Sequence, residues 1–474
     1  MGDPCCACFN IINIRFIFRI LNISDVSSLE APLLARWLSG VGIMAHLLLA
    51  SMFIGTITFA VVAEFRYLRN RDEDWRFLAR TFSVIATIFL GVGAAFGTLV
   101  EFGLVTIWSN FVTLIGSGLV LPFYFELYAF LMEVVLIPIY AFTWDKFRNG
   151  WHHWLIGLLV ALGALYSAFN ILAVMAAMSM RPPGLEIVEL PKSIGHVIQY
   201  AAVFTSPLGV LNMFWSGAEI FIFHGILAAL ILSWSAIAGV TIYSQRRSPR
   251  PYKVKALRTI LPALTALIAI EGFVLGHYQG ELVLQEDPLK LAAIEGLFWN
   301  GFKVDPIMSL LAYGDTAHGF WGYFSWPASI RPPQFLPAFY LGFMVAGGVL
   351  LGAWSLGLTL YYYELHRIRA LGWIKGLEGL LVGGGPYALV ILAALASIGG
   401  AVTAEVGRQP FILVSSTPSA GGPPEITGIP VGPGLYNPTL VLTPWLAALV
   451  FAVEVAMPAL AIYMVYLYLR RRSE

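Results

Sequence analysis

Long apolar segments recur along the whole sequence, and each is long enough to cross a lipid bilayer as an α-helix. In hydrocarbon a helix satisfies its own backbone hydrogen bonds, so these segments predict spanning helices. The composition agrees, because 58% of the 474 residues are hydrophobic and only 12% are charged. We expect about nine spans, over Val41–Glu64, Phe82–Trp108, Leu119–Phe142, Trp154–Met178, Ala218–Tyr243, Ala256–Gly276, Ala338–Tyr363, Tyr387–Val402 and Pro444–Leu469. The sequence therefore predicts an all-α, polytopic membrane helical bundle.

Basic residues predict how this bundle is oriented. They cluster after the first, third, fifth, seventh and ninth spans, whereas the other connections are poor in Lys and Arg for their length. The clustered residues are Arg66, Arg69, Arg71, Arg76, Arg80, Lys146, Arg148, Arg246, Arg247, Arg250, Lys253, Lys255, Arg367, Arg369, Lys375, Arg470, Arg471 and Arg472. Because basic loops stay in the cytoplasm, we expect a multi-pass cell-membrane protein with its N-terminus outside and its C-terminus inside.

The first residues differ from the rest of the chain. They hold all three cysteines, Cys5, Cys6 and Cys8, so the membrane part has no disulfide or thiolate site. Metal binding and acylation are two alternative roles for this cysteine cluster. No cleavage-like site follows the apolar segment 9–23, and we expect an N-terminal extension or interfacial helix over residues 1–34. The formal net charge of +1 gives no indication of nucleic-acid binding, and we expect no nucleic-acid partner.

Three longer connections are expected on the outside. They are Ser179–Gly217, His277–Pro337 and Gly407–Thr443, and the second is polar enough to be a substrate loop. The Gly383–Gly385 run before the eighth span is typical of a flexible turn.

The third span carries two carboxylates, Glu126 and Glu133. A carboxylate inside a bilayer costs several kcal/mol, so it rarely persists without a partner or a task. The seven-residue spacing places both side chains on nearly the same helix face. That face must point into the protein, toward a cofactor, an ion or a proton path. A pair of structural hydrogen bonds between helices is the alternative.

Residues able to ligate or to move protons gather in the expected outer half of the membrane. They are His46, Glu101, Glu126, Glu133, His224, His277, Met344 and Glu405. Each histidine alone also fits a structural hydrogen bond, and Met344 alone fits packing. Together, His and Met on facing helices indicate axial heme ligation in a bundle core.

Several motifs then resemble those of a known family. They are Lys290–Glu295 (KLAAIE), Glu405–Pro410 (EVGRQP), Glu101–Phe102 followed by Trp108, Trp144–Asp145, and the looser Met180–Gly184. From about Ala35 to the C-terminus, in order, the chain resembles subunit I of the cytochrome bd quinol oxidases. The resemblance implies a heme-binding transmembrane domain over 35–474 with an extracytoplasmic quinol loop at about 277–337.

The resemblance also implies roles for single residues. His224 and Met344 look like the axial pair of a low-spin heme b, and Lys290 and Glu295 look like the quinol-loop residues. The resemblance implies that a high-spin heme b and a heme d or substitute heme are surrounded by His46, Glu126, Glu405, Arg408 and Glu101. It also implies a proton path that includes Glu133 and Ser167. Which of His46, Glu126 and Glu405 ligates which heme is left open.

The implied enzyme is a membrane-bound terminal oxidase. It would oxidise quinol at the outer face and reduce oxygen to water at heme, with protons taken from the inside. Such an arrangement generates a proton gradient without a pump. The implied partners are the lipid bilayer, quinol and oxygen. The resemblance further implies a second integral membrane subunit.

The sequence departs from the family pattern at several positions. Gly342 stands where an Arg is usual, Val105 stands where a Gly is usual, and the small residues 399–401 replace an expected Trp. Two alternatives follow. The first is a quinol-linked protein with heme b alone and no heme d. The second is a heme-free, proton-coupled transporter that uses Glu126 and Glu133 as its relay.

Overall fold

The computed structural model describes residues 31–193, 197–431, 435, 437, 440 and 442–473. Cys5, Cys6, Cys8 and nearly all of the expected extension over 1–34 lie outside the described residues. Within the described part, nine helices are long and apolar enough to cross a membrane. The prediction of an all-α bundle with nine spans is therefore confirmed.

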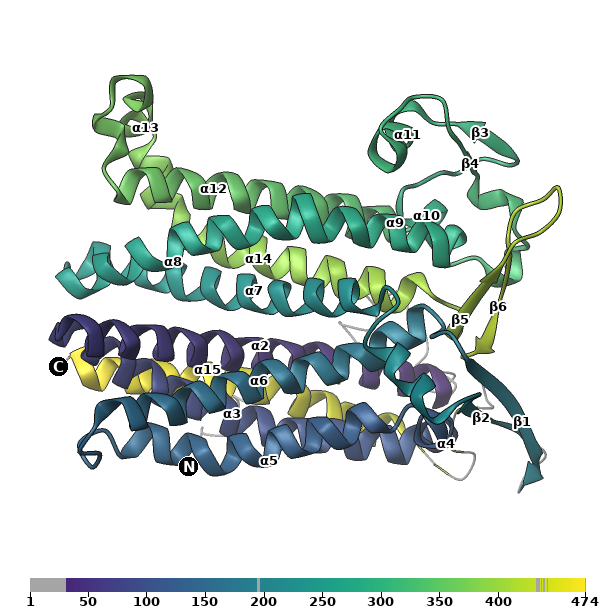
Figure 1. The fold of residues 1–474 in the computed structure, drawn as a ribbon, viewed down its shortest axis with the longest axis horizontal. Coiled ribbons are helices and arrows are strands. Elements are labelled where there is room, and N and C mark those ends of the chain that lie inside the picture. Colours follow the sequence, from purple (N-terminus) through teal and green to yellow (C-terminus); the bar gives the residue numbers. More distant parts are fainter. Residues whose placement is uncertain are drawn as a thin grey trace, which may run out of the picture.

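These spans lie side by side along the long axis of the molecule (Figure 1). They are α2 (Ala31–Asn70), α3 (Glu73–Ile107), α5 (Leu121–Phe142), α6 (Gly150–Ser179), α7 (Ala218–Arg247), α8–α9 (Pro251–Ile270 and Gly276–Glu286, joined by η3 at Glu271–Leu275), η6–α12 (Ala338–Val345 and Ala346–Tyr362), α14 (Glu378–Gly407) and α15 (Pro444–Ser473). The segments η3 and η6 are π-helical, and both interrupt spans that are otherwise α-helical.

Local sequence explains where several spans begin. The Asp72 side chain accepts a hydrogen bond from the Asp74 backbone N–H and so caps α3, and Asn149 caps α6 in the same way. Asp72 and Asp74 also pair with Lys255 at 2.5 and 2.6 Å. This contact ties the α2–α3 turn to the first turn of α8, at the basic end of the bundle.

Two expectations were wrong. His277 does not begin a loop, because the sixth span continues through η3 and α9 to Glu286. The Gly383–Gly385 run is not a turn, because it lies inside α14. A Cβ on Gly384 would lie 3.0 Å from the Trp354 ring, so small residues here let α14 pack closely on α12.

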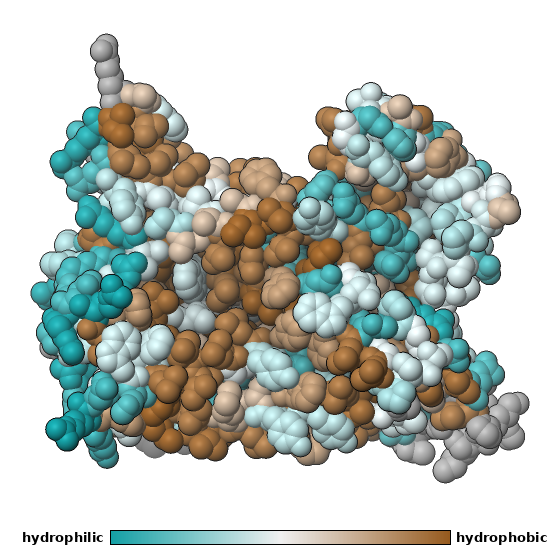
Figure 2. All heavy atoms as spheres, in the orientation of Figure 1, coloured by the Kyte–Doolittle hydropathy of each residue, from teal (hydrophilic) through white to brown (hydrophobic). Residues whose placement is uncertain are grey.

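The two ends of the bundle differ. One end carries the hairpins β1–β2 (Leu185–Ser193, Val197–Phe204), β3–β4 (Phe302–Val304, Gly319–Trp321) and β5–β6 (Phe411–Thr417, Glu425–Pro430), with α4 (Ser109–Gly118), η2 (Pro207–Met213), α10 (Pro288–Ile294) and α11 (Pro306–Tyr313) (Figure 1). We call it the loop end. The other end carries the short α13 (Trp373–Gly376) and the basic connections. Figure 2 shows hydrophilic side chains at that basic end and a hydrophobic belt over the middle of the helices.

Candidate functional site

The two carboxylates of α5 both face α6. Glu126 accepts a hydrogen bond from Ser167 Oγ at 3.2 Å. Glu133 is only 3% exposed, and its Oε1 lies 3.5 Å from the position that a Cβ on Gly163 would take. The shared helix face that the seven-residue spacing predicts is therefore present.

The same face continues toward the basic end. Tyr140, again seven residues on, is fully buried and stacks on His153 of α6, with 5.0 Å between ring centroids. His153 Nδ1 lies 2.7 Å from Oε1 of Glu64 on α2, and its Nε2 lies 2.9 Å from the Tyr140 carbonyl oxygen. Sequence reasoning missed this buried group. The repeat from Glu126 through Glu133 to Tyr140 was the signal that could have found it.

His46 lies where α2 meets α3. A Cβ on Gly97 would lie 2.7 Å from the His46 ring, so only glycine gives the imidazole this room. Within the described chain, His46 Nδ1 is buried and has no hydrogen-bond partner. Glu101 lies one turn after Gly97 and within electrostatic reach of Glu126. The structure therefore brings the His46, Glu101 and Glu126 positions together between α2, α3 and α5.

His224 of α7 faces a carboxylate that sequence reasoning missed. Its Nδ1 lies 3.1 Å from Oε1 of Glu271, the first residue of the π-helical turn η3. The contact is not aligned as a hydrogen bond, because among the described residues this Nδ1 has no such partner. Glu271 is a carboxylate inside a predicted span, which was itself a signal of function. π-helical turns are also frequent at functional sites.

Met344 lies in the second π-helical segment, η6, which packs against α14. A Cβ on Gly399 would lie 2.8 Å from the Met344 backbone nitrogen, and one on Gly400 would lie 3.3 Å from the Met344 sulfur. The small residues that depart from the family pattern thus let η6 approach α14. Because α7 also packs on α14, His224 and Met344 belong to one group of helices. Their axial pairing stays a prediction.

A buried charged cluster joins α10 to the end of α14. Lys290 is 6% exposed, and its Nζ donates to the Ala404 carbonyl oxygen at 3.4 Å. Arg408 is 3% exposed and donates from Nη2 to Glu405. Asp287 caps α10, and burial raises its pKa to about 6. Burial also lowers the pKa of Lys290.

Glu295 connects this cluster to the Met344 segment. It follows α10 directly, and its carboxylate accepts a hydrogen bond from the hydroxyl of Tyr340 on η6. Burial raises the pKa of Glu295, and the Tyr340 hydrogen bond opposes that rise. Tyr340 lies four residues before Met344, so the KLAAIE segment contacts the proposed heme helix directly.

Buried polar atoms show whether these residues fit a heme. A heme takes nitrogen or sulfur ligands on its iron, and its propionates need cationic partners. Unpaired buried polar groups are costly, so they indicate an absent partner. Within the part of the chain that the structure describes, such atoms include Nδ1 of His46 and His224, Oε1 of Glu133, Oε2 of Glu271, and Nε and Nη1 of Arg408. Two imidazoles, a thioether and an arginine with free donors fit heme binding.

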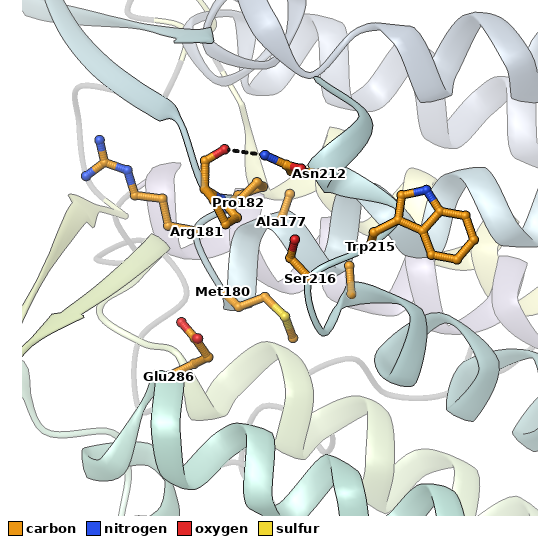
Figure 3. Close-up of a pocket in the computed structure, with 10 residues that line it drawn as sticks. Ala177, Met180, Arg181, Pro182, Asn212, Trp215, Ser216 and Glu286 are labelled. Atoms are coloured by element: carbon orange, nitrogen blue, oxygen red, sulfur yellow. Dashed lines mark hydrogen bonds between the residues drawn. The ribbon is translucent and has the colours of Figure 1, made fainter. Parts of the chain in front are cut away.

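A separate pocket opens at the loop ends of α6, α7 and α9 (Figure 3). Its cavity volume is about 50 Å³, and it is lined by Met180, Trp215, Ser216 and Glu286, among others. Figure 3 shows the Arg181 guanidinium pointing away from Glu286, and Arg181 Nε donates to a backbone carbonyl oxygen at 2.6 Å. Since none of the predicted site residues lines this pocket, we place the functional site among the buried polar groups instead.

Comparisons with known proteins identify the family of the chain. The family of cytochrome bd terminal oxidase subunit I matches residues 34–473. A putative cytochrome bd menaquinol oxidase subunit I of Bacillus subtilis is 26% identical over 405 residues, which cover 80% of this chain and 86% of the relative. The cytochrome bd ubiquinol oxidase subunit 1 of the same organism is 26% identical over 403 residues, covering 78% and 81%.

A solved structure extends the similarity to the fold. The bd oxidase from Geobacillus thermodenitrificans superimposes with a TM-score of 0.75 at 25% identity, covering 93% of this chain and 98% of that one. Family, motifs and fold therefore agree that the chain is a multi-pass, heme-dependent quinol:oxygen oxidoreductase subunit and belongs to the cytochrome bd oxidase subunit I family.

Proposed function

We propose that quinol is oxidised at the loop end, in contact with Glu295 and Lys290. Glu295 accepts a proton from the quinol hydroxyl, and its raised pKa makes it a stronger base than an exposed glutamate. Lys290 Nζ makes a long contact of 3.4 Å with Ala404, which leaves it hydrogens to donate to a quinone oxygen. Protons taken from quinol are released at this end.

The observation that carries this proposal is the contact between Glu295 and Tyr340. Tyr340, which Glu295 contacts, lies four residues before Met344, the expected sulfur ligand. Electron and proton acceptors for the same substrate would then lie on adjoining segments.

The described side chains define where heme would be held. His224 and Met344 would hold a low-spin heme b. His46, Glu126 and Glu405 would hold a high-spin heme b and a heme d or substitute heme, and Arg408 has free donors for a propionate. Heme bound there supplies the one-electron chemistry by which quinol reduces oxygen to water.

Protons for oxygen reduction are proposed to enter from the basic end. Glu133 and Glu126 with Ser167 form the inner part of this route, and the Glu64–His153–Tyr140 group extends it along the same helix face. With the basic end in the cytoplasm, the N-terminus and quinol loop lie outside and the C-terminus lies inside. Release of protons on one side and consumption from the other builds a gradient without pumping.

A second integral membrane subunit is proposed to cover part of the bundle. The most apolar stretch of α15 is only 11% buried within this chain, and the corresponding stretch of α5 is 28% buried. These faces must meet lipid or another subunit. Purification in mild detergent followed by mass measurement tests this partner.

A reduced-minus-oxidised optical spectrum with heme extraction tests the function. Heme b together with a chlorin supports the full proposal. Heme b alone favours the variant without heme d, which the departure at Gly342 motivates. Absence of heme would contradict the ligand assignments. The heme-free transporter is set aside, since the chain belongs to an oxidase family.

A further inference from the structure

Glu454 of α15 is a carboxylate that neither the motifs nor the proposed mechanism uses. It lies in the middle of an apolar spanning helix and is 7% exposed. Its Oε2 is buried, and nothing in the described part of the chain gives it a hydrogen bond. A buried carboxylate without a partner costs several kcal/mol, so its retention indicates a ligand outside the chain.

The position of Glu454 is defined by a glycine. A Cβ on Gly42 of α2 would lie 2.8 Å from Glu454 Oε1 and 3.5 Å from the Val100 side chain of α3. No larger residue at position 42 would leave the carboxylate where it is. The carboxylate therefore sits in the seam between α2, α3 and α15, and these three helices pack on one another.

The same seam holds His46. Gly42 and His46 are four residues apart on α2, so they lie on one face, one turn from each other. Helical side chains lean toward the N-terminus, which tilts His46 toward the level of Gly42. On α3, Gly97 faces His46 and Val100 faces Gly42, which gives the same alignment. Two buried polar atoms without hydrogen-bond partners among the described residues, His46 Nδ1 and Glu454 Oε2, thus share one seam.

We propose that Glu454 is a further residue of the prosthetic-group site at His46, where its carboxylate contacts the group bound there. This inference rests on the proposed heme at His46. It adds α15 to a site that the motifs placed on other spans only. The chemical class of the ligand is an iron porphyrin or chlorin with its polar substituents.

Matched variants test this assignment by spectroscopy. Glu454→Gln removes the charge, and Gly42→Ala displaces the unchanged carboxylate. Gly40→Ala, on the same helix, is the control, because no described atom lies within 4 Å of its added Cβ. Optical spectra and redox titrations of the purified protein would follow each heme, with the low-spin heme proposed at His224 as internal reference.

We expect E454Q and G42A to shift the absorbance band and midpoint potential of at least one heme other than the one held by His224 and Met344. G40A should match wild type, and the low-spin band should stay unchanged in all three. If E454Q does not assemble, G42A decides alone. Unchanged bands in E454Q and G42A, or equal shifts in G40A, would overturn the assignment. Wild-type protein without heme would instead contradict the proposed function.

Discussion

Two buried polar groups of this bundle, one at the loop end and one along α5 and α6, differ in the charges they contain. At the loop end, Lys290 and Arg408 stand beside Asp287 and Glu405, so cations and anions are interleaved. Along α5 and α6, the contacts are between carboxylates, hydroxyls and an imidazole. Fixed cations suit the binding of a propionate or a quinone oxygen. Protonatable groups at two-turn intervals suit proton transfer. The difference indicates that the loop-end group binds a propionate or a quinone oxygen, and that the group along α5 and α6 conducts protons.

The largest expected effect is the loss of a heme. Changing His224 to Ala removes the nitrogen ligand of the expected low-spin pair, so its spectral band should disappear while the protein still inserts. The control is His277→Ala, since His277 is a half-exposed residue of α9. Optical spectra of both variants check this. An unchanged low-spin band in H224A would remove the assignment.

A second prediction separates substrate binding from conduction. Glu295→Gln keeps the shape of the side chain but removes the proton acceptor, so quinol oxidation should slow by about 100-fold. The heme bands should stay near wild type, because the amide oxygen of the new side chain can still accept a hydrogen bond from Tyr340. Stopped-flow reduction by quinol measures the rate. A normal rate would argue against a proton-accepting role.

A substitution in the proton-conducting group along α5 and α6 should slow oxygen reduction and leave quinol oxidation unchanged. Glu133→Gln blocks protonation at the buried step of α5, and we expect oxygen reduction to slow by roughly 10-fold to 100-fold. Reduction of the hemes by quinol should be unaffected. Flash-induced oxidation kinetics of the reduced protein measure the oxygen reaction separately from the reduction of the hemes by quinol. Slow quinol reduction with normal oxygen kinetics in E133Q would break the division between the groups.

Apolar length predicted all nine spans of the described part of the chain, and the spacing of Glu126 and Glu133 predicted their common face. Glu271 and Glu454 were not predicted although both are carboxylates in apolar helices, and neither lies within a motif. The π-helical segment η6 was not predicted; it packs on Gly399 of α14, which is far from it in the sequence. Tertiary contacts of this kind leave no periodicity in the sequence.

Packing at Gly399 gives a smaller effect. A Cβ there would lie 2.5 Å from the Phe339 carbonyl oxygen and would push η6 away from α14. Gly399→Ala should therefore shift the low-spin heme band and its potential without removing the heme. Gly383→Ala in the same helix is the matched control, because no described atom lies within 4 Å of its Cβ. Equal spectra for the two variants would show that Met344 does not depend on this contact.

The last prediction concerns the pH dependence of stability at the loop end, where we expect the smallest effect. Burial raises the pKa of Asp287 from 3.8 to about 6, so the native state binds this proton more tightly than the unfolded one. Stability from this group is therefore fully present below pH 3.8 and is lost as the pH rises through 6. The difference amounts to about 3 kcal/mol. Asp287→Asn keeps a capping acceptor for the Lys290 N–H and removes the titration. Hydrogen exchange of α10, corrected for intrinsic rates, should show protection falling between about pH 4 and 7 in wild type only. Protection that rises with pH in wild type would mean that the ion pair with Lys290 outweighs the cost of burying the Asp287 charge.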